Sequence, residues 1–103
     1  MMPAPVTDAA VLLVRALRIS ARAAGAAVVV CATDERSWAS AIFAGVRHRI
    51  DLQVDQNTAT DDWLAALLEA DLPLRGHLVA DLTLDRHPGQ VRLEVLTIEN
   101  DDA

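Results

Sequence analysis

In the segment FAGVRHRIDLQVD, Phe43 to Asp55, apolar and polar residues alternate with the two-residue period of a β-strand. The even positions are apolar apart from His48, and the odd positions after Gly45 are polar. Such a strand has one buried and one exposed face, so the segment predicts a sheet that covers a core on one side. The alternation also places Arg47 and Arg49 on the face opposite to His48, so the three cannot act together on one small ligand.

Gly45 leaves two interpretations of this segment open. Either Ala44-Gly45 is a two-residue hairpin turn, or Gly45 is a bulge within one long strand that begins at Trp38. Ala-Gly is not a preferred hairpin dipeptide, and the apolar even positions continue through Gly45, so we favour one bent strand. The length of that strand argues for the turn, because strands average about five or six residues.

Upstream, the sequence predicts a helix over residues 8–24, with Thr7 as its N-cap and Gly25 as the left-handed residue that ends it. The segment Ala26–Thr33 is apolar on both alternating faces, as expected for a strand that is covered on both sides. The polar segment Asp34–Ser37 then predicts a turn.

Downstream, an amphipathic helix is predicted between Thr60, a good N-cap, and Pro73, which stops a helix. Its charged residues lie opposite an apolar face, so the helix must lie on another element, and a sheet is the expected support. The predicted apolar face contains Trp63, Leu64, Leu67 and Leu68.

A β-hairpin is predicted at the C-terminal end, with a Pro88-Gly89 turn. Its first strand follows Gly76 and is expected to bury Leu78, Ala80, Leu82 and Leu84. The return strand is expected to bury Val91, Leu93 and Val95. After Val95 the apolar residues change from odd to even positions, at Leu96 and Ile98, which predicts a bulge or an edge that another chain covers.

The order helix, strand, strand, helix, strand, strand predicts a single two-layer α+β domain over residues 1–103, with frayed ends at 1–6 and 100–103. We expect a four-stranded, mostly antiparallel sheet with two helices on one face. Each half begins with a helix, which indicates a structural repeat. The order is also that of a ferredoxin-like βαββαβ chain whose first strand has moved to the end, a topological likeness that carries no function.

Composition limits the classes of partner. The formal charge of -6 and the sequence pI near 4.8 repel polyanions, so neither nucleic acid nor an anionic membrane is expected. Arg15 and Arg18 interrupt the N-terminal apolar run, which predicts neither a signal peptide nor a membrane helix. The nine basic residues are all Arg, a bias typical of GC-rich codons that indicates a bacterial source.

Cofactor and metal sites are not expected. Cys31, the single cysteine, predicts a reducing compartment such as the cytoplasm and a buried, unreactive thiol. The nearest approach to a metal site is Asp85-x-His87, with His77 and Asp81 on the same strand face, but the ligand spacings of zinc sites are missing. The glycines are isolated, so no phosphate-binding loop is predicted.

Two groups of residues are candidates for binding or chemistry. The first group consists of arginines, for which two interpretations are open. They contact an anion or a protein partner, or they form a solvated surface with ion pairs to Glu94, Asp81 or Asp85. These arginines are Arg15, Arg18 and Arg22 on one stripe of the first helix, with Arg47 and Arg49 as a possible extension. The second is His48, a weak catalytic candidate, since a histidine on an apolar face is more often a hydrogen-bonded core residue.

The apolar surface exceeds what one interior face requires, because the first helix, the first strand and the last strand are apolar on more than one side. We therefore expect a homodimer whose contact lies on the free face of the sheet or along an edge. The favoured function is a non-catalytic, self-associating protein-interaction module that also has a possible protein partner. The alternative is a small-ligand-binding protein or enzyme with a pocket near His48, between sheet and helices or at a dimer seam.

Overall fold

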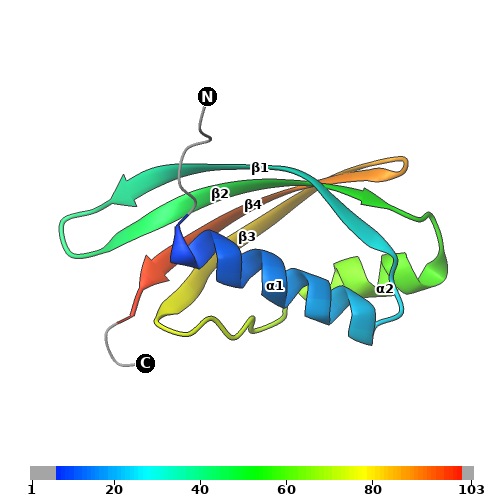
Figure 1. Cartoon of the computed structure of the whole chain (residues 1–103), viewed down its shortest axis with the longest axis horizontal. Coiled ribbons are helices and arrows are strands. Elements are labelled where there is room, and N and C mark those ends of the chain that lie inside the picture. Colours follow the sequence, from blue (N-terminus) through cyan, green and yellow to red (C-terminus); the bar gives the residue numbers. More distant parts are fainter. Residues whose placement is uncertain (1–6, 101–103) are drawn as a thin grey trace.

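The computed structural model describes residues 7–100 and has the predicted order of elements. Of the ends that were expected to fray, residues 1–6 and 101–103 lie outside the described part. No helix within residues 7–100 is long and apolar enough to cross a membrane. The elements are α1 (Asp8–Ala23), β1 (Val28–Ala39), β2 (Ala44–Val54), α2 (Thr58–Leu67), β3 (His77–His87) and β4 (Gln90–Glu99) (Figure 1).

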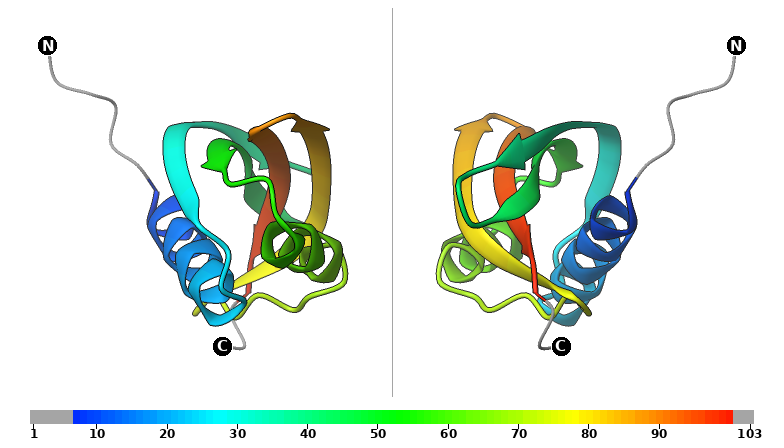
Figure 2. Two further views of the ribbon diagram at one scale, coloured as in Figure 1. Left: turned by 90° about the vertical axis from the view of Figure 1, so that its right-hand side faces the viewer. Right: turned by 90° about the vertical axis from the view of Figure 1, so that its left-hand side faces the viewer.

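The four strands form one antiparallel sheet in the order β1-β2-β4-β3, and both helices lie on one of its faces (Figure 1). The predicted two-layer α+β fold is therefore confirmed. The sheet curls over the helices, with α1 beneath the β1 side and α2 beneath the β3 side (Figure 2). The last strand, β4, lies between β2 and β3, as expected if the first strand of a ferredoxin-like chain is moved to the end.

The core fills the space between the helices and the inner face of the sheet. Trp63 in α2 is 2% exposed, and its indole Nε1–H donates to Ser20 Oγ in α1 over 3.0 Å, which joins the two helices. The fully or nearly buried aliphatic side chains around them are Leu13, Leu17, Ile50, Leu52, Leu64, Leu67, Val91, Leu93 and Val95.

Helix α1 agrees with its prediction. The Thr7 hydroxyl accepts a hydrogen bond from the Ala10 amide at 3.1 Å, as an N-cap does. Gly25 has a φ of 74° immediately after the helix, in the left-handed region that favours glycine.

The predicted turn at Asp34–Ser37 is wrong, because β1 continues through it to Ala39. The chain turns at residues 40–43, where the Ser40 hydroxyl accepts a hydrogen bond from the Phe43 amide at 3.1 Å. Gly45 lies inside β2 and forms neither the proposed turn nor a bulge in a strand that starts at Trp38. A Cβ atom at Gly45 would overlap the Thr97 carbonyl oxygen, so glycine permits a close approach of β2 to β4.

Bulges occur instead in the two edge strands. Between Val79 and Asp81 the register of β3 shifts, so Leu78 and Ala80 are exposed instead of buried, and Leu78 is 54% exposed. The equivalent shift in β1 falls at Cys31. An extra residue reverses the face to which the preceding residues point.

The prediction of a bulge or a covered edge near Leu96 is confirmed only in part, because the bulge of β3 lies opposite Leu96 and Thr97 but β4 is neither bulged nor an edge. Strand β4 is hydrogen-bonded on both sides and keeps its register against β2 to the last pair, Gly45 with Ile98. Thr97 continues the inward row, so Leu96 and Ile98 belong to the outer face.

Helix α2 begins earlier and ends earlier than predicted. Asn57 is its N-cap and accepts from the Thr60 amide at 2.9 Å, so Thr60 lies within the helix and is buried. The helix ends at Leu67, well before Pro73. Leu68 is therefore outside the buried face and is 54% exposed.

Candidate functional site

His48 lies on the inner face of the sheet, on β2, between Glu35 of β1 and Val95 of β4. The residue is 4% exposed, and its Nε2 atom is 2.8 Å from the Thr97 hydroxyl oxygen. The same hydroxyl also contacts the Val46 carbonyl oxygen at a longer distance of 3.5 Å. His48 therefore links the two central strands.

The surroundings of His48 favour the neutral imidazole. Burial away from water lowers the pKa of His48 below its ordinary value, an effect that the Glu35 carboxylate partly opposes and the His77 ring reinforces. Glu35 itself is occupied elsewhere, because its two carboxylate oxygens accept from the Thr7 amide at 3.1 Å and the Thr7 hydroxyl at 2.9 Å. Glu35 thus ties β1 to the start of α1, and the pair does not present an accessible acid and base.

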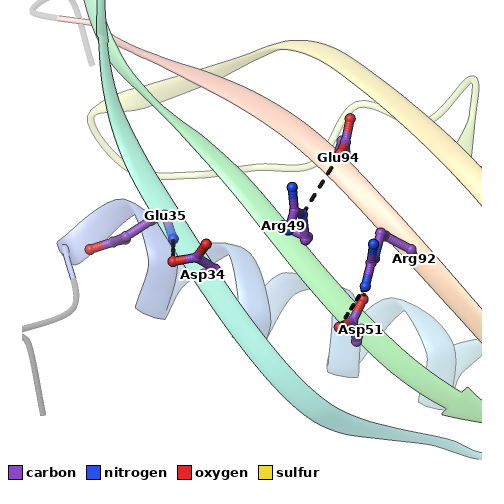
Figure 3. A network of polar contacts seen from close by, with 6 residues as sticks. All are labelled: Asp34, Glu35, Arg49, Asp51, Arg92 and Glu94. Carbon is purple, nitrogen blue, oxygen red and sulfur yellow. Dashed lines mark hydrogen bonds and ion pairs between the residues drawn. The ribbon is translucent and has the colours of Figure 1, made fainter.

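The outer face of the sheet carries cross-strand ion pairs (Figure 3). Arg49 in β2 lies 3.8 Å from Glu94 in β4, the partner that the sequence predicted for it. One row further along the same strands, Arg92 donates to Asp51 at 2.8 Å, and this hydrogen bond lowers the pKa of the Asp51 carboxyl group. Two ion pairs on this face thus join β2 to β4.

Arg36 joins this face as a residue that sequence reasoning missed. Because β1 continues past the expected turn, Arg36 lies directly opposite Arg47, and both side chains are exposed. Within residues 7–100 neither guanidinium group has an ion-pair partner. A hollow of about 170 Å³ opens here, lined by Asp34, Glu35, Arg36, Arg47, His48, Arg49, Glu94 and Val95.

A second hollow runs along the exposed flank of α1 and reaches β1. Its volume is about 550 Å³, and its apolar lining includes Val11, Val14, Ile19 and Val30. The three helix arginines Arg15, Arg18 and Arg22 line it as well, and they have no ion-pair partner in the described part of the chain. The helix arginines and the β2 arginines thus lie on opposite sides of the sheet and do not form one continuous strip.

The exposed face of α2 has the opposite charge. Asp61, Asp62 and Glu69 are exposed, and no basic residue occurs between Thr58 and Asp71. Asp61 pairs with Arg86 of β3 at 2.6 Å. Asp62 and Glu69 have no ion-pair partner among the described residues, and Leu68 next to Glu69 is exposed.

The remaining chemical candidates are dispersed. Asp85 and His87 approach within 3.4 Å at the end of β3, but no group of three or more potential metal ligands occurs within residues 7–100. Cys31 is exposed, so the predicted buried thiol is wrong, because the bulge in β1 removes it from the alternating pattern. Cys31 is four residues from Glu35, the partner of His48, so the two side chains form no dyad.

Comparisons with known proteins leave the function to be inferred from these surfaces. No protein-family model matches the chain, and neither curated proteins nor solved structures include a match. Three features are therefore available for a functional argument: the buried His48, the arginine cluster of the outer face, and the two oppositely charged helix surfaces.

Proposed function

We propose that this protein is a non-catalytic association module that forms a homodimer through its helix layer. In the proposed dimer α1 of each copy packs against α2 of the other. The observation that carries the proposal is that α1 and the residue directly after α2, Leu68, expose apolar side chains on the same side of the sheet, while the charges of the two helix surfaces are opposite. Val11, Ile19 and Leu68, for example, are 47%, 61% and 54% exposed.

Apolar exposure supports an interface on this layer. Ile19 and Val11 flank the hollow of about 550 Å³ beside α1, which offers a concave surface for a helix. Burying such side chains gains about 25 cal/mol for each Å² of apolar area removed from water. The outer face of the sheet is less suitable, because burial there would desolvate the Arg49–Glu94 and Asp51–Arg92 pairs.

Charge favours one arrangement of the two copies. Packing α1 against α1 of the second copy would bring the unpaired arginines Arg15, Arg18 and Arg22 together and would be repulsive. Packing α1 against α2 of the second copy brings them near Asp62 and Glu69. A two-fold axis repeats the same contact in the reverse direction, so the assembly closes as a dimer.

The alternative, a small-ligand protein with a pocket at His48, has weaker support. The His48 residue is 4% exposed, and its Nε2 atom already bonds to Thr97. A general base must reach the proton that it removes, directly or through one water molecule. The contacts of His48 are those of a structural residue.

Native mass spectrometry and sedimentation of charge-reversed variants test the dimer. The first variant, Arg18→Glu with Arg22→Glu, makes both helix surfaces acidic, and the second, Asp62→Arg with Glu69→Arg, makes both basic. Each variant alone should be monomeric, whereas an equimolar mixture should form a 1:1 heterodimer, because both contacts then pair opposite charges.

Arg75→Glu is the matched control, since Arg75 is exposed outside both helices. This variant should remain dimeric. A wild-type protein that is monomeric at tens of micromolar, or charge-reversed variants that dimerise as well as the wild type, would contradict the proposal.

A further inference from the structure

We infer that the outer face of the sheet binds a small, multiply charged oxyanion through Arg36, Arg47 and Arg49. The ligand class comprises phosphate-type anions and short dicarboxylates, which share two or more negative oxygen atoms. The site is separate from the helix layer and does not depend on the proposed dimer.

The antiparallel register creates the site. Arg36 of β1 and Arg47 of β2 are a directly opposed pair, and Arg49 lies two residues further along β2 on the same face. Directly opposed residues have Cβ atoms about 4.5–5.5 Å apart, so the two guanidinium groups share one small region of the surface. Like charges at this position destabilise the sheet unless an anion lies between them.

The two carboxylates on this face, Asp34 and Glu94, make their described contacts with groups other than Arg36 and Arg47. Asp34 accepts a hydrogen bond from the Glu35 amide at 3.0 Å, and Glu94 faces Arg49 at 3.8 Å (Figure 3). Neither Arg36 nor Arg47 has an ion-pair partner within residues 7–100. The three arginines and two carboxylates on the outer face here leave one net positive charge, on a chain whose formal charge is -6.

The dimensions and chemistry of the hollow limit the ligand. A volume of about 170 Å³ corresponds to roughly five or six water molecules at about 30 Å³ each. Five of its lining residues, Asp34, Arg36, Arg47, Arg49 and Glu94, are on the outer face, so the hollow opens there. Guanidinium groups bind carboxylate or phosphate oxygens in a two-pronged manner that lysine does not reproduce.

Isothermal titration and thermal unfolding at low ionic strength test the site. Inorganic phosphate, pyrophosphate and malonate are the probes, and sodium chloride at equal ionic strength is the reference. At least one probe should bind the wild type with saturation and raise its Tm more than chloride does. The ratio of the affinities for phosphate and malonate shows whether the site prefers phosphate-type anions or short dicarboxylates.

Arg36→Gln and Arg47→Gln should each weaken binding at least tenfold, and Arg36→Gln should raise the Tm in the absence of anion, because the repulsion is removed. Arg75→Gln, which removes the same charge elsewhere on the surface, should bind as the wild type does. The inference is overturned if the Arg36 and Arg47 variants respond to every probe as the wild type does. It is also overturned if no probe exceeds the effect of chloride.

Discussion

The unit α1-β1-β2 and the unit α2-β3-β4 share one plan, and they meet at the centre of the sheet where β2 pairs with β4. In each unit the edge strand has a bulge at its fourth residue, Cys31 in β1 and Ala80 in β3. The units differ in their helices, because α1 has 16 residues and three arginines without an ion-pair partner among residues 7–100, whereas α2 has 10 residues and acidic exposed positions. A repeated backbone thus carries two surfaces of opposite charge.

The largest expected effect concerns the contact between the units. Gly45→Ala should lower the free energy of unfolding by about 3 kcal/mol, the upper end of the range for overpacking, because the obstructing atoms belong to the Thr97 backbone. Urea unfolding followed by tryptophan fluorescence measures the change. Gly89→Ala is the comparison in the second unit. Gly89 has a φ of 73°, and an added Cβ atom would have no described neighbour within 4 Å apart from the adjacent residues. This variant should therefore cost only about 1–2 kcal/mol. If Gly45→Ala lowers the free energy of unfolding no more than Gly89→Ala does, then β2 does not approach the Thr97 backbone of β4 closely at Gly45.

The next effect concerns the link between the helices. Ser20→Ala removes the acceptor of the Trp63 indole N–H and should cost about 2 kcal/mol, since a buried donor is left without a partner. Thermal and urea unfolding measure this loss. Ser40→Ala removes a comparable hydroxyl from the exposed turn, where water can replace it, and should cost under about 1 kcal/mol. Equal losses for the two variants would contradict the indole hydrogen bond.

A gain in stability is expected in the second unit. The Thr60 hydroxyl oxygen is buried without a hydrogen-bond partner, so Thr60→Val should raise the free energy of unfolding by up to about 1 kcal/mol. Thr83→Val, at an exposed position of β3, is the control and should change stability less. A marked loss in Thr60→Val would mean that the hydroxyl group has a partner.

The smallest effect at neutral pH comes from His48 in the first unit. The pKa of His48 is lower in the folded protein than in the unfolded chain, so the unfolded chain binds a proton more tightly and protonation favours unfolding. Stability should therefore fall as the pH decreases through the ordinary histidine pKa of about 6.5. His48→Gln removes this titration, so its stability should depend less on pH than that of the wild type between pH 7.5 and 5.5, in urea unfolding at several pH values. Parallel curves would contradict the lowered pKa.

Local patterns predicted most of the fold correctly. The caps of α1, the Pro88-Gly89 turn and the alternation from Val46 to Val54 depend on a few neighbouring residues, so a sequence pattern records them directly. The errors fall where a distant contact decides. The polar segment Asp34–Ser37 is typical of a turn, yet it remains a strand because it pairs with residues 46–49.

The candidate sites were predicted in part. Separation of His48 from Arg47 and Arg49 followed from a period of two and needed no further information. Arg36 was missed because its position depends on the pairing of β1 with β2. Residues 33–37 are polar at every position, so no alternating pattern in the sequence could have revealed it.

The sequence by itself determined the order αββαββ, the caps of α1 and the buried face of the central strands, because side-chain periodicity and backbone preference act over a few residues. Tertiary structure decided which strands are neighbours, where the two bulges lie and why position 45 is glycine. These features depend on residues that are far apart in the sequence, such as Gly45 and Thr97, whose contact no local pattern specifies.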